Sequence, residues 1–244
     1  MEQSHLVEAP PARYAVVLTV HSVMTARFDR GLATVLNSAD MGAPDGMPLV
    51  WALRSLGVSG QTRVYGPNLM LALCEQAARL GHRVFLYGGR EEMLPLLSEK
   101  LLGRFPTLPI AGVYAPPFRP LTAEEDAECV RRIRASDADM VFVGIGAPKQ
   151  EQWMYAHRHL LPGMVMLGVG AAFDFHAGRV RQAPPWMQAA GLEWLFRLSM
   201  EPARLWKRYV LFNPLFVGLW FLQRFGILGF PLPENAAAAR RKAA

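Results

Sequence analysis

Short apolar runs rich in β-branched and aromatic residues recur along this chain, and segments with helical spacing separate them. The stretch at 69–80, for example, puts Leu69, Leu73, Ala77 and Leu80 on one helical face. Continuous apolar strands that alternate with helices are typical of a parallel sheet covered on both faces. The pattern therefore predicts an α/β fold. The expected strands are residues 14–20, 63–65, 83–87, 110–114, 140–143 and 165–169, and the expected helices include 47–56, 69–80 and 91–102.

Length and charge limit the classes of function. A chain of 244 residues suits one α/β domain with a small appendage. The formal net charge of +6 predicts attraction to anions, which include nucleic acid, anionic lipid and phosphorylated substrates. Because no Lys/Arg-rich run with interleaved aromatics occurs in mid-chain, nucleic acid is the least favoured of these partners. The N-terminus lacks a basic segment followed by an apolar one, so no signal peptide is expected. The two cysteines, Cys74 and Cys129, lie apart and predict buried thiols in a reducing compartment.

The pattern divides the chain into four parts. Residues 1–12 are expected to be a disordered lead-in, 13–200 the core, 201–232 a basic and apolar C-terminal appendage, and 233–244 a disordered tail. The apolar run at 210–222 contains Asn213 and Pro214 and is too short to cross a hydrocarbon layer of ~30 Å. Its aromatic side chains and flanking cations favour a helix lying in the membrane interface. The alternative is a helix packed on the core or on a neighbouring subunit, so a homo-oligomer is compatible with the sequence.

The segment 143–154, VGIGAPKQEQWM, combines groups suited to binding an anion. An apolar strand ends at Gly144 and Gly146, which allow a tight turn and close approach of the backbone to a ligand. A helix that begins near Pro148 would present free N–H groups, and Lys149, Gln150 and Glu151 follow directly. In parallel sheets, ligands bind at the carboxyl ends of the strands, where this segment is expected to lie. The alternative is a strand–turn–helix corner with a solvated charge cluster.

The block GAPKQE resembles a signature of the WecG/TagA/CpsF family of bacterial glycosyltransferases, and four more blocks resemble that family in the expected order. These blocks are PDGMPLVW (44–51), RVYGPNLM (63–70), GVGAAFDFHAG (168–178) and QAPPWMQAAGLEWLFRLSMEPARLWKRY (182–209). The resemblance implies a Rossmann-like core and a membrane-associating C-terminal appendage. It implies transfer of a sugar, with inversion, from a UDP-sugar to a polyprenyl-diphosphate-linked glycan. The implied location is the cytoplasmic face of the bacterial inner membrane, as a peripheral protein.

Asp45 is the candidate catalytic base. From local sequence, Pro-Asp-Gly predicts a turn aspartate that caps the next helix. The resemblance instead assigns the base to this aspartate, and a carboxylate can take the proton of an acceptor hydroxyl. A Thr-x-Asn pair of the wider family is replaced here by Val16 and Leu18. His21, at the end of the first expected strand, is therefore the polar candidate there, with a structural hydrogen bond as the alternative. Gln150 completes the candidate catalytic set.

Several further residues are candidates for holding the donor and its diphosphate. Gly88 and Gly89 follow a strand and form either a diphosphate cradle or a plain turn. Asp174 and His176 are expected either to contact the nucleotide or sugar or to cap a helix. In the family, basic residues of the C-terminal block are thought to clamp the nucleotide, although here they also suit membrane anchoring. Glu193 is expected to be the structural partner of an arginine. The cationic candidates are Arg197, Arg204, Lys207 and Arg208.

No metal or other cofactor is expected. Asp137 and Asp139 form a DxD, the motif with which metal-dependent glycosyltransferases bind a diphosphate, but they precede a strand at the amino end of the sheet. Two other functions remain open. A nucleotide-dependent oxidoreductase is disfavoured by the missing GxGxxG and ribose-binding acid. A non-catalytic membrane scaffold would not require the Lys-Gln-Glu cluster.

Overall fold

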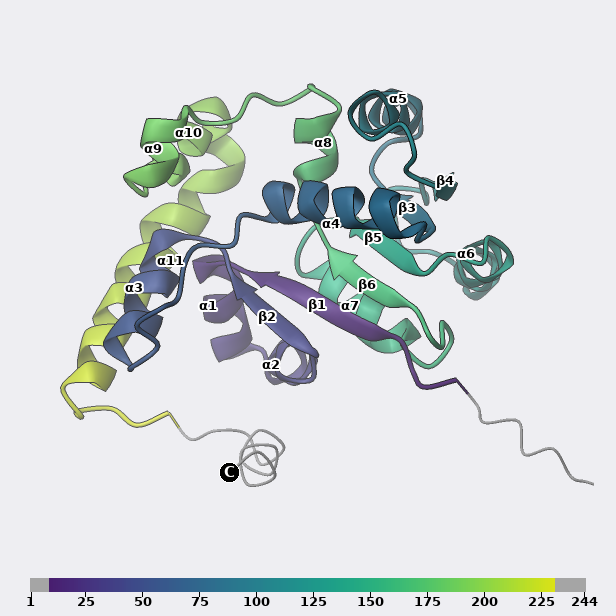
Figure 1. Cartoon of the computed structure of the whole chain (residues 1–244). Helices are drawn as coiled ribbons and strands as arrows, with labels where there is room; N and C mark the ends of the chain where they lie inside the picture. Colours follow the sequence, from purple (N-terminus) through teal and green to yellow (C-terminus); the bar gives the residue numbers. More distant parts are fainter. Residues whose placement is uncertain (1–8, 231–244) are drawn as a thin grey trace, which may run out of the picture. The chain divides into compact units, whose positions relative to one another are not determined.

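The structure, a computed structural model, describes residues 9–230, apart from the side chains of Ala189, Arg204, Lys207 and Arg208. The chain forms two compact units that are interleaved in sequence (Figure 1). One unit contains the chain up to Val16, Ala39–Met41 and Gly66–Val180, and the other contains Val17–Ser38, Gly42–Tyr65 and the chain from Arg181 onward. We call them the sheet unit and the helical unit.

A six-stranded sheet has the order β2-β1-β6-β5-β3-β4. The strand pairs β1–β6, β6–β5, β5–β3 and β3–β4 are parallel. Val84, for instance, lies opposite Met140, and Met140 lies opposite Val165. Strand β3 is buried along its whole length, which explains its continuous apolar sequence. The strands are β1 (Arg13–Leu18), β2 (Met41–Pro44), β3 (Val84–Gly88), β4 (Ile110–Tyr114), β5 (Met140–Gly144) and β6 (Val165–Gly168). The α/β, Rossmann-like architecture predicted from the sequence is confirmed.

Helices cover both faces of the strands in the sheet unit. Figure 1 shows α4, α5 and α8 on one side of β3, β5 and β6, and α6 and α7 on the other. Thr122 and Glu125 form a capping box that fixes the start of α6. The helices of this unit are α4 (Gly66–Leu80), the 3₁₀ turn η1 (Glu91–Met93), α5 (Leu94–Arg104), α6 (Ala123–Ala135), α7 (Lys149–His157) and α8 (Ala172–His176).

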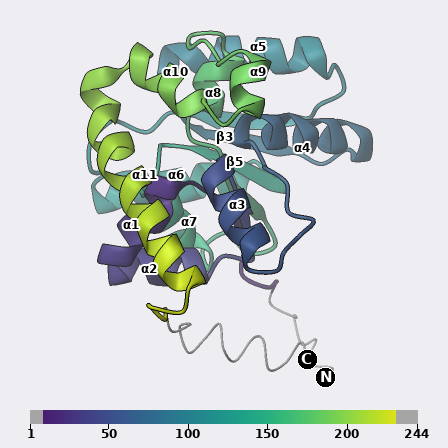
Figure 2. The same cartoon turned by 90° about the vertical axis from the view of Figure 1, so that its left-hand side faces the viewer.

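The helical unit is built around its C-terminal helix. Phe216 of α11 is buried with Val20 and Met24 of α1 and with Leu49 and Ala52 of α3. Figure 2 shows α1, α3 and α11 side by side. The helices of this unit are α1 (Val20–Phe28), α2 (Arg30–Asn37), α3 (Met47–Ser55), α9 (Pro185–Ala189), α10 (Glu193–Met200) and α11 (Pro202–Arg224).

Helix α11 packs on the helical unit, which is one of the two alternatives for this segment, and the membrane-interface alternative stays a prediction. One face packs inside the helical unit, where Trp220 also donates a hydrogen bond from Nε1 to Oγ of Ser55 at 2.8 Å. The opposite face exposes a row of large apolar side chains, which are Val210, Leu211, Leu215, Val217, Phe221 and Leu222. Within residues 9–230, no helix is both long and apolar enough to span a bilayer.

One predicted strand is wrong, and another is confirmed but ends earlier than expected. Residues 63–65 do not form a strand; Val64 only donates its N–H to the carbonyl of Pro44. The sixth strand is instead β2, whose Gly- and Pro-containing sequence MGAP lacks a strand signal. The first strand ends at Leu18, two residues early, because the side chain of Thr19 accepts the N–H of Ser22 and caps α1. His21 therefore lies in a helix.

The ends of the chain and the cysteines bear on other predictions. Residues 1–8 and 231–244 lie outside the described part, including most of the expected lead-in and the whole expected tail. Pro10 accepts the N–H of Gly163, and Ala12 donates its own to Arg158, so the last lead-in residues are hydrogen-bonded. Cys74 and Cys129 are buried free thiols, as predicted. The four-part division of the chain remains a prediction.

Candidate active site

Asp45 stands at the end of β2 and is tied to the sheet by its backbone. Its N–H donates to the carbonyl of Leu18 at 2.7 Å. The next residue, Gly46, has φ of 118°, a conformation that L side chains rarely adopt, and it is the N-cap of α3. Helix α3 has no side-chain cap, so the interpretation of Asp45 as a capping aspartate is wrong. Its carboxylate is available for another role.

Arg63 holds the Asp45 carboxylate and joins it to a second acid. Nε of Arg63 donates to Oδ1 of Asp45 at 2.8 Å, and Nη2 lies 2.8 Å from the same oxygen. Nη2 also donates to Oε2 of Glu193, the first residue of α10, at 2.6 Å. The prediction that Glu193 pairs with an arginine is confirmed. All three side chains are at most 16% exposed, so water screens these interactions poorly.

The surroundings of Asp45 shift its pKa upward. Burial is the main cause, because it disfavours the charged carboxylate, and the nearby charge of Glu193 adds to it. Arg63 opposes the shift by its charge and its hydrogen bond, and the charge of Arg197 opposes it as well. For Arg63, burial works against the charged form, but the two carboxylates outweigh it and raise its pKa. Arg63 therefore stays a cation, and Asp45 is a base stronger than an ordinary aspartate.

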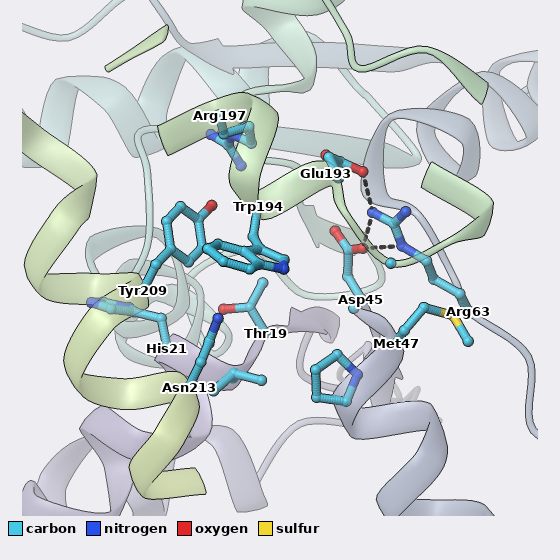
Figure 3. A pocket seen from close by; sticks show the side chains of 14 residues that line it. Thr19, His21, Asp45, Met47, Arg63, Glu193, Trp194, Arg197, Tyr209 and Asn213 are labelled. Atoms are coloured by element: carbon cyan, nitrogen blue, oxygen red, sulfur yellow. Dashed lines mark hydrogen bonds and ion pairs between the residues drawn. The ribbon is translucent and has the colours of Figure 1, made fainter. Parts of the chain in front are cut away.

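A pocket of about 90 Å³ opens beside Asp45 in the helical unit. Both contacts from Arg63 end on Oδ1, and Figure 3 shows the second carboxylate oxygen on the side turned away from Arg63. The polar side chains of the pocket come from α1 and its N-cap, from α10 and α11, and from Asp45 and Arg63, which lie outside the helices. In addition to Asp45, Arg63 and Glu193, the lining includes Thr19, His21, Trp194, Arg197, Tyr209 and Asn213.

The structure brings two predicted residues into this pocket with Asp45. His21 lies in α1, its ring 5.5 Å from that of Phe212 between centroids. Arg197 lies in α10 and is close enough to Asp45 to lower its pKa. Arg204, Lys207 and Arg208 lie on α11, but their side chains are outside the described residues.

The glycines of the sheet unit meet at the carboxyl ends of β3 and β5. Gly88 lies opposite Gly144, and a Cβ on Gly88 would stand 2.5 Å from the carbonyl carbon of Gly144. Gly89 donates its N–H to the carbonyl of Gly144 at 3.0 Å. This close packing explains Gly88 without a ligand and uses one N–H of the expected cradle. Gly144 is explained by the Phe173 ring, which would lie 2.6 Å from a Cβ at that position. Gly146, with φ of 84°, borders open space.

The Lys-Gln-Glu cluster is split between interior and surface. Gln150 is 4% exposed and Glu151 2%. The Gln150 amide donates to Oε1 of Glu151 at 2.9 Å and accepts the N–H of Gly170 at 3.0 Å, so it links α7 to the loop after β6. Lys149 is exposed, with Nζ 5.7 Å from the ring centre of Phe118. The alternative of a wholly solvated cluster is wrong for Gln150 and Glu151.

Among the remaining candidates of the sheet unit, His176 and the two acids of the DxD motif make local contacts. His176 donates from Nε2 to the carbonyl of Pro67 at 3.0 Å, and burial lowers its pKa. Asp174 is partly buried in the first turn of α8, which has no side-chain cap, so the capping alternative is wrong for it. Asp139 accepts the N–H of Arg83, and Asp137 pairs with the Arg83 side chain at 3.7 Å, before β5. No three His, Cys, Asp or Glu side chains within 9–230 are grouped to hold a metal ion.

Arg63 is the central residue that sequence reasoning missed. Residues 63–65 are predicted as a strand, and an arginine at the first position of a strand does not indicate a functional site. Asp45 lies 18 residues away in the sequence and Glu193 lies 130 away, so no local pattern joins the three. The available signal was a single arginine ahead of a short apolar segment, combined with the expectation that Glu193 needs such a partner.

Comparison with known sequences identifies the family of this chain. The sequence model described as "Glycosyl transferase WecG/TagA/CpsF family" matches residues 2–228. The chain belongs to this family. It is similar to the N-acetylglucosaminyldiphosphoundecaprenol N-acetyl-beta-D-mannosaminyltransferase of Bacillus subtilis, at 34% identity over 196 residues. That match covers 80% of this chain and 74% of the relative. The enzyme of the same name from Bacillus spizizenii is 37% identical over 174 residues, which cover 71% of this chain and 65% of the relative. Family membership confirms the resemblance stated from the five blocks.

Proposed function

We propose that this protein transfers a hexose-type sugar from a UDP-sugar to a polyprenyl-diphosphate-linked glycan, with inversion at the anomeric carbon. The observation that carries the proposal is the Asp45 carboxylate, buried beside a pocket and held by Arg63, in a chain of the WecG/TagA/CpsF family. By their names, the two Bacillus relatives act on an N-acetylglucosaminyl-diphosphoundecaprenol acceptor. Family membership favours this function over a nucleotide-dependent oxidoreductase or a non-catalytic scaffold.

In this mechanism Asp45 is the general base. It takes the proton of an acceptor hydroxyl as that oxygen forms a bond to the anomeric carbon of the donor. The bond from the same carbon to UDP breaks, and UDP leaves with the electron pair. Attack opposite the leaving group converts an α-linked donor into a β-linked product. The raised pKa of Asp45 supports this role, because a more basic carboxylate accepts the proton more readily.

The leaving diphosphate requires positive charge. Arg197, which lines the Asp45 pocket, is the described cation best suited to it, because the charge of Arg63 is shared between two carboxylates. Arg204, Lys207 and Arg208 of α11 are assigned to the same task as a prediction. The donor-binding roles of Gly88, Gly89, Gly144, Gly146, Lys149, Glu151 and Asp174, and the catalytic roles of Gln150 and His21, also remain predictions.

Peripheral attachment to the cytoplasmic face of the membrane belongs to the same proposal. The exposed apolar face of α11 supports it, and Phe225, Ile227 and Leu228 continue the exposed apolar residues beyond the helix. A lipid-linked acceptor would be presented at that surface. Self-association remains a prediction.

The test is a transfer assay with the purified chain. A thermal-shift screen first identifies the UDP-sugar that raises the melting temperature most, because a ligand of the native state stabilises it. That donor is then incubated with a water-soluble diphosphate-linked acceptor analogue, and released UDP and the linkage of the product are measured. We expect a β-linked product. Retention of the donor configuration, or failure of every UDP-sugar to bind and react, would refute the proposal.

A further inference from the structure

A second cavity in the helical unit is larger than the Asp45 pocket and differs in chemistry. It is partly open and has a volume of about 540 Å³, within the range of roughly 300–1,000 Å³ typical of small-molecule sites. We call it the apolar chamber. Its walls come mainly from α1, α2, α3 and α11, represented by Met24, Ala33, Leu53, Phe216, Leu219 and Trp220.

Polar groups in the chamber are few and mostly satisfied. Asn37 donates its side-chain amide to the carbonyl of Ala33, and the indole N–H of Trp220 is bonded to Ser55. Among the described lining residues, Arg27 is the only charged one, and its side chain is exposed. A sugar or nucleotide here would leave most of its hydroxyls without partners, which is costly in an apolar site. The chamber therefore suits a hydrocarbon ligand.

Three helices line both cavities with successive turns. On α1, His21 borders the Asp45 pocket and Ala26 borders the chamber. On α3, Met47 is followed in the same way by Leu53. On α11, Asn213 of the pocket precedes the chamber residues, of which Gln223 is the last on that helix. These two residues are about 15 Å apart along the helix axis. The chamber therefore extends away from Asp45 along α1, α3 and α11. Figure 2 shows these three helices side by side.

The far ends of these helices are exposed and apolar. Phe28 ends α1 and is 69% exposed, Leu56 follows α3 at 52%, and Phe225 follows α11 at 72%. The last chamber residues at the ends of these helices are Arg27, Leu56 and Gln223. Each of the three exposed side chains therefore lies within two residues of the chamber lining. Large exposed apolar side chains thus lie near the end of the chamber farther from Asp45. This is the arrangement expected where a lipid chain enters from a membrane surface.

We propose that the apolar chamber binds the first isoprene units of the acceptor's polyprenyl chain, while the sugar at the other end of the diphosphate reaches Asp45. The inference rests on the proposed function, because it assigns a position to the lipid of that acceptor. One molecule would then occupy both cavities, with its polar end in the polar pocket and its hydrocarbon in the apolar one. The chamber would fix the distance between lipid and base and select acceptors that carry a long chain.

The experiment fills the chamber and compares two acceptors. Ala33→Trp places a large side chain in the α2 wall, and Thr34→Trp places the same side chain on an exposed position of the same helix as the matched control. With a polyprenyl-diphosphate-linked acceptor in detergent, we expect Ala33→Trp to lower kcat/KM at least about tenfold. With a water-soluble acceptor analogue that lacks the chain, its kcat/KM should stay within about twofold of the unsubstituted protein. Thr34→Trp should leave both values unchanged.

A second variant and a labelling experiment keep the inference testable if Ala33→Trp does not fold, as judged from its melting temperature. Ala26→Phe fills the chamber from α1 and should give the same selective loss. A polyprenyl diphosphate carrying a photoreactive group on its first isoprene unit should label α1, α3 or α11, and excess unlabelled polyprenyl diphosphate should abolish the labelling. Displacement by ordinary phospholipid to the same degree would assign the chamber to bilayer acyl chains and overturn the inference.

The outcomes separate the two proposals. Equal losses on both acceptors, or no loss in a folded variant, would overturn the chamber assignment and leave the transferase function standing. If the unsubstituted protein transfers sugar to neither acceptor, the proposed function fails, and the labelling result alone then decides whether the chamber holds a polyprenyl chain.

Discussion

The guanidinium of Arg63 reaches a single oxygen of Asp45, Oδ1, with Nε and Nη2 each at 2.8 Å. The same Nη2 is bonded to Glu193 at 2.6 Å. Two opposing charges therefore act on one buried carboxylate, because Arg63 lowers the pKa of Asp45 and Glu193 raises it. In the proposed mechanism, the rate of sugar transfer therefore depends on residues that need not touch the substrate.

Replacing the base should stop the chemistry without unfolding the protein. In Asp45→Asn the amide keeps the size of the side chain but cannot take the acceptor proton, so we expect kcat to fall roughly 10²-fold or more. The melting temperature and UDP binding should change little, as measured by thermal shift and calorimetry. Near-normal turnover in this variant would exclude Asp45 as the base.

Removing the positive charge should move the pH profile upward. As the proposed base, Asp45 must be deprotonated, so we expect the rate to rise as pH increases through its pKa. Because Arg63 lowers that pKa, Arg63→Gln should shift the acidic limb of kcat/KM to higher pH. It should also cost about 3 kcal/mol of unfolding free energy, since two buried carboxylates lose their cation. Arg54→Gln, at an exposed position of α3, is the control and should leave the profile unchanged.

Removing the second carboxylate should move the profile the other way. The charge of Glu193 raises the pKa of Asp45, so Glu193→Gln should shift the acidic limb to lower pH. The amide oxygen of glutamine can still accept the hydrogen bond from Arg63, which keeps the geometry close to the original. The measurement is kcat/KM against pH. A shift in the same direction as that of Arg63→Gln would contradict the assignment of opposing charges.

Chelation should leave activity intact. The two acids of the DxD motif contact Arg83 before β5. In the proposed mechanism, arginine side chains therefore neutralise the diphosphate that departs. We therefore expect the same initial rate of UDP release before and after treatment with EDTA. A loss that Mg²⁺ or Mn²⁺ restores would show that the proposed metal-independent mechanism is wrong.

The two faces of α11 should respond differently to substitution. Phe225, which is 72% exposed, is assigned to the membrane, so Phe225→Asp should weaken vesicle binding roughly tenfold with little change in melting temperature. Phe216 is buried among α1, α3 and α11, and Phe216→Ala should cost about 3–5 kcal/mol of stability. Vesicle flotation and thermal unfolding distinguish the two effects. Unchanged flotation of Phe225→Asp would remove this residue from the proposed membrane contact.

The sequence alone determined the elements whose signal is local. The apolar runs that form β3, β5 and β6 were predicted because a strand buried on both faces must be continuously apolar. The expectation that Glu193 pairs with an arginine was also correct, since a buried carboxylate requires a partner. Only the tertiary structure decided which arginine this is, and that the same guanidinium holds Asp45.

Strand β2 was missed because MGAP acquires its strand geometry from its place beside β1 and has no propensity of its own. The Asp45 pocket depends on contacts of Arg63 with residues 18 and 130 positions away in the sequence. Such contacts are set by how helices and strands pack. The periodicity of the sequence does not encode that packing.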